Sequence, residues 1–293
     1  MVDKWLKGDP FVNRVRITGT LTTRSPLHIG TGETREIMDG DETCQVSTIV
    51  RDHRGKPLIP GSSLRGVMRH WLAQIWQGLH PGREVWPERD GIQEMSQPEQ
   101  IRHIREAFGW LELLFGTTFN AGKIEVWDGV CMTSAAGDRD ELIHWDPDRL
   151  TYVDTSTAID PATGTVMDKL LYKADVVPPG IAFQASITGQ NLSDVELGLT
   201  LLALQGFNSQ IFPIQLGARG GRGYGLMRFE LDKVYFLEQA QARDWILDMV
   251  QNLGGDDGMA EAGYFALPEL SAEAQQALVA RAKAALLAEM EVQ

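Results

Sequence analysis

The alternation of apolar and polar residues close to the start of the chain predicts a half-buried β-strand. Val15, Ile17 and Leu21 alternate with polar neighbours, and Gly19 has the same phase. Because successive side chains of a strand point to opposite faces of a sheet, one face here is expected to lie in a core. The same reasoning predicts further strands at residues 46–50, 123–130 and 226–236, and a polar, acidic loop at residues 33–42.

The clearest predicted element is an amphipathic helix that begins soon after Pro60. Its apolar positions are Leu64, Val67, Met68, Trp71, Leu72, Ile75, Trp76 and Leu79. They recur at the spacing of one helix face, so we interpret the stripe as core, with Ser62 or Ser63 as the N-cap. Arg65 and Arg69 are four residues apart, so they are expected to project together near the positively polarised end of the helix.

Turn and capping signals divide the rest of the chain. Tight turns are predicted at residues 52–56 and 160–164, and an insertion loop rich in Pro, Gly, Trp and charge at residues 78–100. Ser193, with Glu196 at the capping-box position, predicts another helix, and residues 271–290 predict a final, alanine-rich one. This order of strands and helices is compatible with an α+β, ferredoxin-like fold that carries insertions.

Length and composition narrow the class of protein. The chain has 293 residues, 43% of them hydrophobic, enough for one large domain or one domain with elaborate insertions. It has neither an apolar run of about 18 residues nor the apolar stretch of a secretory signal. The two cysteines, Cys44 and Cys131, lie far apart without histidine partners at metal spacing. We therefore expect a soluble, cytoplasmic protein with no membrane partner, no disulfide framework and no zinc site.

The net charge of −13 is unevenly distributed along the chain. Residues 230–293 contain twelve acidic and four basic residues, whereas residues 51–70 contain five Lys or Arg against the single acid Asp52. Residues 215–229 contain three arginines and no acid. Such basic segments fit a protein with one anion-binding face, although ordinary scatter of charge gives the same pattern.

Residues 217–225 form the least ordinary stretch of the sequence. Five of the nine residues are glycines, and the others include Arg219, Arg222 and Tyr224. Glycines let a backbone approach a partner closely, arginines bind phosphate, and a tyrosine ring stacks on an unpaired base. The spacing matches neither a dinucleotide-binding glycine motif nor a Walker loop. Two interpretations of residues 217–225 remain, namely a segment that contacts RNA and a flexible surface loop.

Two other groups of residues are candidates for chemistry. His28 lies between the apolar residues Leu27 and Ile29 and fits a structural histidine better than a catalytic one. Five acids crowd residues 33–42, namely Glu33, Glu36, Asp39, Asp41 and Glu42. Clustered carboxylates can hold a divalent cation that assists phosphodiester hydrolysis, but a solvated acidic loop has the same composition.

Several segments, in order, are similar to motifs of the RAMP superfamily of CRISPR proteins, and above all to the repeated backbone subunit of type III effectors. These segments are Pro26-Leu27-His28-Ile29-Gly30-Thr31-Gly32, Val50-Arg51-Asp52, Pro57-Leu58-Ile59-Pro60-Gly61-Ser62-Ser63-Leu64-Arg65-Gly66, Leu114-Phe115-Gly116, Pro178-Pro179-Gly180 and Gly220-Gly221-Arg222-Gly223-Tyr224-Gly225. The resemblance extends from about residue 15 to about residue 230 and leaves out the acidic tail.

The resemblance implies an RNA-recognition-type palm over residues 1–236, with an insertion near 78–110, a β-hairpin thumb near 150–189 centred on 155–177, and a helical C-terminal extension over 237–293. It implies binding of guide RNA and target RNA, beside neighbouring RAMP-type subunits and other effector proteins. The residues it places against RNA are Gly30, Gly32, Ser62, Ser63, Arg65, Arg69, Lys169, Arg219, Arg222 and Tyr224.

One departure from the family pattern concerns cleavage. Active members cut target RNA with a divalent metal and an aspartate six residues before the acid that corresponds to Asp52, and here that position is Val46. Asp39, Asp41 or Glu42 could replace it, with Mg²⁺ or another divalent cation and no organic cofactor. The alternatives to a structural RNA-binding subunit are a metal-dependent endoribonuclease, a guide-processing nuclease that uses His28, and a protein adaptor.

Overall fold

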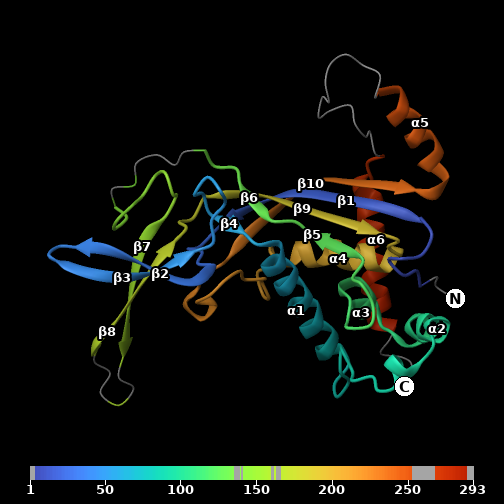
Figure 1. The fold of residues 1–293 in the computed structure, drawn as a ribbon, viewed down its shortest axis with the longest axis horizontal. Helices are drawn as coiled ribbons and strands as arrows, with labels where there is room; N and C mark the ends of the chain where they lie inside the picture. The colour runs from blue at the N-terminus through green and yellow to red at the C-terminus, as the bar shows by residue number, and fades with distance from the viewer. Residues whose placement is uncertain are drawn as a thin grey trace.

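The chain folds into a mixed arrangement of β-sheets and α-helices, which confirms the predicted α+β class (Figure 1). A computed structural model describes residues 4–134, 139, 141–159, 162, 166–252 and 268–288, with the backbone alone at 42, 158–159, 166–171 and 248–252. Among the described residues, no helix combines the length and the apolar character that crossing a membrane requires.

A central sheet is formed by six strands that are distant in sequence. They are β1 (Asn13–Thr23), β4 (Leu58–Ile59), β5 (Ile124–Val126), β6 (Gly129–Cys131), β9 (Ala182–Gln190) and β10 (Met227–Glu238). The order is β10-β1-β9-β6-β4, with β5 also paired to β9, and every pairing is antiparallel. Val15, Ile17 and Leu21 of β1 are buried, as their alternation predicts.

Helices cover one face of this sheet (Figure 1). They are α1 (Gly61–Leu79), α3 (Trp110–Phe115), α4 (Asp194–Gly206) and α6 (Ala272–Ala288). The apolar stripe of α1 and the inner faces of α4 and α6 share one core with β1 and β9. At Gly198 of α4, a Cβ would lie 2.2 Å from the Leu278 carbonyl oxygen, so α6 packs directly against α4. The remaining helix of the C-terminal extension, α5 (Ala242–Asn252), projects away from the sheet.

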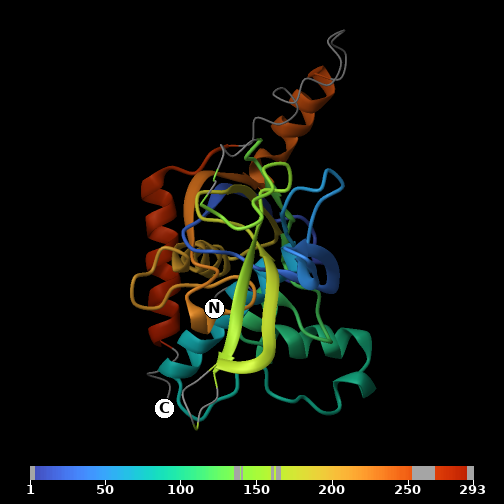
Figure 2. The ribbon, with the colours of Figure 1, turned by 90° about the vertical axis from the view of Figure 1, so that its left-hand side faces the viewer.

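A second sheet projects beyond the end of the central one (Figure 1). It consists of the hairpins β2 (Gly30–Asp39) with β3 (Glu42–Ile49) and β7 (Tyr152–Ile159) with β8 (Val166–Val176). A short parallel pairing of Val46 with Lys173 and Ser47 with Ala174 joins the two hairpins. Figure 2, viewed from this side, shows β7 and β8 as a long two-stranded ribbon in front of the sheet.

The second sheet corrects two sequence-based predictions. Residues 33–42 are not a loop, because residues 30–39 form β2 and pair with β3, with Glu36 accepting a hydrogen bond from Gln45 Nε2 at 2.8 Å. The strand predicted at 46–50 begins earlier, at Glu42, and ends at Ile49. Most side chains of β2 are exposed on both faces, so the strand carries no alternation of buried and exposed positions.

The start of α1 also differs from the prediction. The helix begins at Gly61 with Pro60 at the N-cap position, so neither Ser62 nor Ser63 is the N-cap. The Gly61 N–H donates to Asp128 Oδ1 at 2.7 Å, and a Cβ at Gly61 would lie 2.1 Å from the Val126 carbonyl oxygen. A carboxylate from a distant segment therefore caps the helix, and only glycine fits between them.

The predicted insertion loop contains more secondary structure than its composition indicates. After an irregular stretch, η1 (Ile92–Glu94) leads into α2 (Gln97–Ala107), which begins with a capping box formed by Ser96 and Glu99. Ile92, Ile104, Phe108 and Leu113 form a small core of their own. The insertion therefore packs around a small core that it shares with Leu113 of α3, with Leu6 and with Phe119.

Candidate RNA-binding surface

Hydrogen bonds bring the glycine-rich segment 217–225 against the end of the β1–β2 connection. The Ala218 N–H donates to the His28 carbonyl at 2.9 Å, and the Gly225 N–H donates to the Pro26 carbonyl at 2.8 Å. Gly217 has a φ of 76°, and a Cβ on it would lie 2.3 Å from the same His28 oxygen. Segments almost 200 residues apart in sequence thus share one surface region, about 26–32 and 217–225.

Further hydrogen bonds extend this region to the start of α1. The Val50 N–H donates to the Ile29 carbonyl at 2.9 Å, and the Leu58 N–H donates to the Val50 carbonyl at 3.1 Å. Beyond Leu58 the chain passes through Pro60 into α1. Arg65 then donates from Nη2 to the Phe115 carbonyl at the end of α3. The segments that carry the family motifs are therefore linked, one to the next, by hydrogen bonds.

The backbone of the glycine-rich segment depends on conformations that glycine favours. A 3₁₀ turn, η2 (Gly220–Arg222), lies between two residues in the left-handed conformation, Arg219 at φ 67° and Gly223 at φ 81°. Gly225 also has a positive φ, 79°, and a Cβ there would lie 2.0 Å from the Leu216 carbonyl oxygen. The segment is held by conformations and close approaches that glycine permits.

We expect Gly225→Ala to destabilise the protein more than Gly223→Ala. Both substitutions force alanine into the left-handed region, which costs about 1–2 kcal/mol. Gly223 has open space around its Cβ position, whereas alanine at 225 also collides with backbone, which adds a further cost of about 1–3 kcal/mol. Urea unfolding of the two variants measures the difference, and equal losses of stability would contradict this account of the segment.

Two of the three RNA-contact candidates in this segment interact with the β7–β8 hairpin. Arg219 Nη1 lies 3.0 Å from Asp154 Oδ2 and 3.3 Å from Ser156 Oγ, both on β7. Burial and a hydrogen bond to Asp154 raise the pKa of Tyr224 to about 12. Arg222 is exposed and forms no ion pair with the described residues. Arg222 is therefore free to bind an anion, while Arg219 and Tyr224 anchor the segment to the hairpin.

The arginines of α1 form a pair without acidic partners. Neither Arg65 nor Arg69 makes an ion pair with a carboxylate of the described residues. The Arg69 guanidinium stacks 4.0 Å from the centre of the Trp86 ring, and its Nε is buried without a hydrogen-bond partner in the described part of the chain. Burial, followed by the charge of Arg65, lowers the pKa of Arg69. Ser62 is exposed and Ser63 half-buried beside them.

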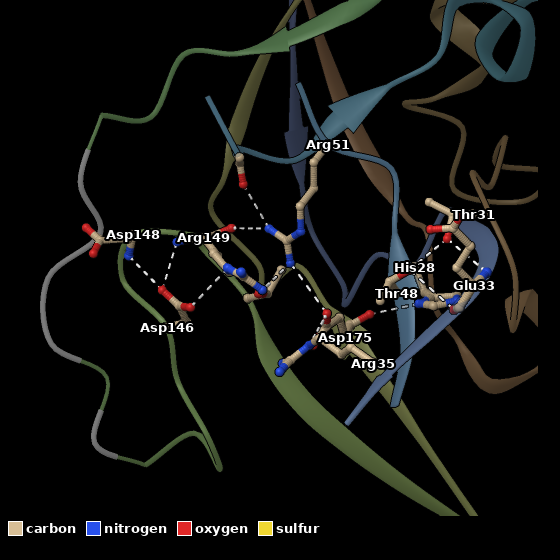
Figure 3. A network of polar contacts seen from close by, with 12 residues as sticks. His28, Thr31, Glu33, Arg35, Thr48, Arg51, Asp146, Asp148, Arg149 and Asp175 are labelled. Atoms are coloured by element: carbon tan, nitrogen blue, oxygen red, sulfur yellow. Dashed lines mark hydrogen bonds and ion pairs between the residues drawn. The ribbon is translucent and has the colours of Figure 1, made fainter. Parts of the chain in front are cut away.

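A buried ion-pair network lies at the base of the second sheet (Figure 3). Asp175 of β8 is fully buried and accepts from Arg35 Nη2 at 2.7 Å and Nε at 3.0 Å, while Arg51 Nη2 lies 3.5 Å away. Its hydrogen bond to Asp175 raises the pKa of Arg35, whereas burial lowers the pKa of Arg51. Two cations thus share one carboxylate where the hairpins meet the central sheet.

His28 belongs to the same network and matches its interpretation as a structural residue. It is buried, and its Nδ1 lies 2.8 Å from the Asp175 carbonyl oxygen. The backbone of Gly30 is tightly packed against it, since a Cβ there would lie 3.0 Å from His28 Nε2. Gly30 and Gly32 are exposed, and Gly32 has a φ of 85°. A histidine so enclosed is poorly placed to act as a general base on a bound strand.

Among the described side chains, the acidic candidates do not come together as a metal site. The Asp39 carboxylate binds Lys173 Nζ and lies 3.6 Å from His144 Nε2, and the hydrogen bond from Lys173 lowers the pKa of Asp39. Asp41 is exposed at the β2–β3 turn, and the side chain of Glu42 lies outside the described part. The described residues contain no group of three His, Cys, Asp or Glu that could hold an ion. Val46, the position of the family's cutting residue, is fully buried.

Lys169, the remaining RNA-contact candidate, lies in β8, and its side chain is outside the described part of the structure. The residues that sequence reasoning missed are Asp154, Asp175 and Arg35, which belong to no motif. Arg51 belongs to the motif Val50-Arg51-Asp52, but its ion pair with Asp175 was not predicted. Each of these residues acquires its partner through strand pairing and turns between distant segments.

A model of the family described as the RAMP superfamily matches residues 20–228, which is more than half of the chain. The chain belongs to the RAMP superfamily. The match includes every motif segment that the hydrogen bonds link, and it stops within β10, so α5 and α6 lie outside it.

Three curated proteins are similar to this RAMP protein. CRISPR system Cmr subunit Cmr6 of Pyrococcus furiosus is 22% identical over 71% of this chain and 66% of its own length. CRISPR system Cms endoribonuclease Csm3 of Mycobacterium tuberculosis is 25% identical over 74% of this chain and 86% of its own length. Csm3 of Enterococcus italicus is 25% identical over 76% of this chain and 92% of its own length. The chain thus spans about two-thirds of Cmr6 and most of each Csm3.

Proposed function

We propose that this chain is a guide-RNA-binding backbone subunit of a type III CRISPR effector complex. The observation that carries the proposal is the pair Arg65 and Arg69 at the start of α1, which lacks carboxylate partners in the described structure and is linked by hydrogen bonds to the other family motifs. Guide RNA and target RNA are the proposed ligands, and neighbouring RAMP-type subunits and other effector proteins the proposed partners.

The electrostatics of the pair favour an anionic ligand. Two guanidinium groups repel each other, and the charge of Arg65 contributes to the lowered pKa of Arg69. A phosphate between them would relieve that repulsion and accept charge-assisted hydrogen bonds from the two guanidinium groups. The first turn of α1 adds a positively polarised end, although Asp128 already accepts from its first N–H.

The arrangement of strands supports an RNA-recognition-type, ferredoxin-like palm. In chain order, β1, α1, β5 with β6, β9, α4 and β10 follow the pattern strand, helix, strand, strand, helix, strand. The sheet order β10-β1-β9-β6 places the first and third strands of that pattern in the middle. The hairpin β7–β8 corresponds to the proposed thumb, and Asp154 attaches it to the glycine-rich segment.

The names of the relatives support the same proposal. One is named as a subunit of a Cmr system and two as Csm3 endoribonucleases, and all three belong to CRISPR systems. The test is co-expression of the tagged chain with its sister subunits and a CRISPR array, followed by sequencing of the RNA that co-purifies. Guide RNA enriched over total RNA is the expected result. An assembled complex that contains this chain but no guide RNA would contradict the proposal.

A second candidate function is metal-assisted cleavage of target RNA at Asp39, Asp41 or Glu42, because two relatives are named endoribonucleases. The described donor set does not fit a divalent cation, since the Asp39 carboxylate is engaged by Lys173 and Asp41 stands alone at an exposed turn. Cleavage with Mg²⁺ at this hairpin therefore stays a prediction that rests on the acid-rich sequence and on the names of two relatives, and no step of a mechanism is assigned to it.

Incubation of the purified complex with target RNA and magnesium tests the cleavage prediction. If the hairpin cuts, Asp39→Ala or Asp41→Ala abolishes cuts at regular spacing while guide binding persists. Glu33→Ala is a matched control, since it removes an exposed acid from the same strand. Cutting that continues unchanged in both aspartate variants would exclude the hairpin as the site of cleavage.

A further inference from the structure

The face of the central sheet opposite α1 and α4 carries polar and aromatic side chains. Arg16, Trp127, Asp128, Gln184, Ser186 and Thr188 line a shallow hollow of about 370 Å³ on this face. Trp127 is 56% exposed, an unusual position for the largest apolar side chain. The function proposed above makes no use of this surface.

The strand register places four of the residues on this face in a row across the sheet. The Trp127 indole N–H, just beyond β5, donates to Thr188 Oγ1 of β9 at 3.2 Å. Thr188 lies opposite Arg16 of β1, and Arg16 lies opposite Tyr235 of β10. Adjacent strands are about 4.8 Å apart, so the row from Trp127 to Tyr235 spans about 14 Å.

The row points away from the core. Ile17, Ile187 and Val234 neighbour Arg16, Thr188 and Tyr235 along their strands, and all three are buried. Because side chains alternate between the faces of a sheet, Arg16, Thr188 and Tyr235 lie on the face that α1 and α4 do not cover. The row therefore presents one aromatic ring at each end and a hydroxyl and a guanidinium between them.

The Trp127 ring is held in place before any ligand binds. Thr188 Oγ1, which accepts from the indole, donates in turn to Glu125 Oε2 at 3.1 Å. Glu125 lies 2.6 Å from Lys7 Nζ and 3.7 Å from Arg14 Nη2. An indole fixed by such a chain of hydrogen bonds loses little conformational freedom when a flat group stacks on it.

The charges around the hollow favour an anion. Arg16 is exposed and makes no ion pair in the described part of the chain. Glu125 lies between two cations, Lys7 and Arg14. Asp128 accepts from the Gly61 N–H and keeps its negative charge, since it makes no ion pair in the described part of the chain. Lys7, Arg14 and Arg16 therefore outnumber the two acids by one positive charge.

We propose that this face binds single-stranded RNA, with bases stacked on Trp127 and Tyr235 and a phosphate held by Arg16. A stacking surface beside an unpaired arginine fits an unpaired nucleotide strand, and Gln184 and Ser186 supply hydrogen bonds for base edges or ribose hydroxyls. The hydrogen bond between Asp128 and Gly61 places the hollow beside the start of α1.

The inference rests on the proposed function in taking RNA as the ligand, but it uses different residues.

The test is the binding of fluorescently labelled oligouridine to the full chain, measured by fluorescence anisotropy. Base–aromatic stacking predicts that Trp127→Ala raises Kd by about five- to 150-fold, whereas Trp127→Phe retains most of the affinity. Arg16→Gln should weaken binding and lower the salt slope by about 0.7. Arg228→Gln is the matched control, since Arg228 is an exposed arginine of β10 that already pairs with Glu230.

Ultraviolet cross-linking and mass spectrometry of the same mixture should identify a peptide that contains Trp127. If Trp127→Ala binds oligouridine normally while an Arg65→Ala, Arg69→Ala double variant does not, the sheet-face site is wrong and the proposed function stands. If the unaltered chain binds no RNA, alone or in the assembled complex, both fail. If Trp127→Ala instead prevents assembly with neighbouring subunits and leaves RNA affinity intact, the face is a protein interface and the inference is overturned.

Discussion

Replacing Arg65 and Arg69 together by alanine is expected to weaken guide-RNA binding by about 100-fold. Each arginine offers charge-assisted hydrogen bonds to a phosphate, worth about 1.5 kcal/mol or more, and about 1.4 kcal/mol corresponds to tenfold in Kd. Neither side chain has a carboxylate partner among the described residues, so the substitution leaves no unpaired acid behind. Loss of two phosphate contacts with a single strand should also lower the salt slope by about 1.4.

The matched control is the double variant Arg83→Ala, Arg102→Ala. It removes the same charge from two exposed positions of the insertion. Fluorescence anisotropy over a series of salt concentrations measures both double variants. If the α1 variant keeps the salt slope of the unaltered chain, Arg65 and Arg69 do not contact phosphate and the assignment of the grip to α1 is wrong.

Lys123→Met should lower the free energy of unfolding by about 3–5 kcal/mol, the usual cost of removing one partner from a buried ion pair. Lys123 Nζ donates to Glu196 Oε2 at 2.7 Å, and the two side chains are 1% and 0% exposed. Burial raises the pKa of Glu196 and lowers the pKa of Lys123, so each charge depends on the other to remain in the core. Without the lysine, Glu196 is left charged without a counterion or must take up a proton.

The position of Glu196 explains why this loss should reach the whole fold. Its carboxylate accepts from the Ser193 N–H at 2.8 Å and closes the capping box that begins α4. Lys7→Met is the matched control, because Lys7 pairs with Glu125 at a partly exposed site where such pairs contribute less than about 1 kcal/mol. Urea unfolding that finds Lys123→Met no more destabilising than Lys7→Met would contradict the structural role of the buried pair.

Elements with a buried face were predictable from the sequence, and elements exposed on both faces were not. The apolar stripe of α1 and the alternation in β1 record burial directly, and both elements are present. In β2 most side chains are exposed, so its polar composition indicates a loop although strand pairing makes it a strand. The predicted N-cap of α1 was wrong for another reason. The carboxylate that caps the helix belongs to Asp128, which lies 67 residues from Gly61, so no local sequence pattern indicates it.

In the candidate site, too, part of the arrangement was predictable from the sequence and part was not. The motifs indicated the glycine-rich segment and the arginines of α1, since those residue types suit phosphate and nucleobases. Which of these side chains are already engaged by an acid could be determined only from the folded structure. Arg219 and Tyr224 are engaged by Asp154, whereas Arg222 is free of ion pairs with described residues. The network of Asp175 with Arg35 and Arg51 likewise depends on the pairing of two hairpins.

An electron cryomicroscopy map of the assembled complex with its guide RNA tests the central claim most directly. The account predicts guide phosphates within hydrogen-bond distance of Arg65 and Arg69, and the backbone of residues 217–225 beside the same strand. The account would be contradicted by a map in which this chain is present but the guide RNA contacts neither α1 nor residues 217–225.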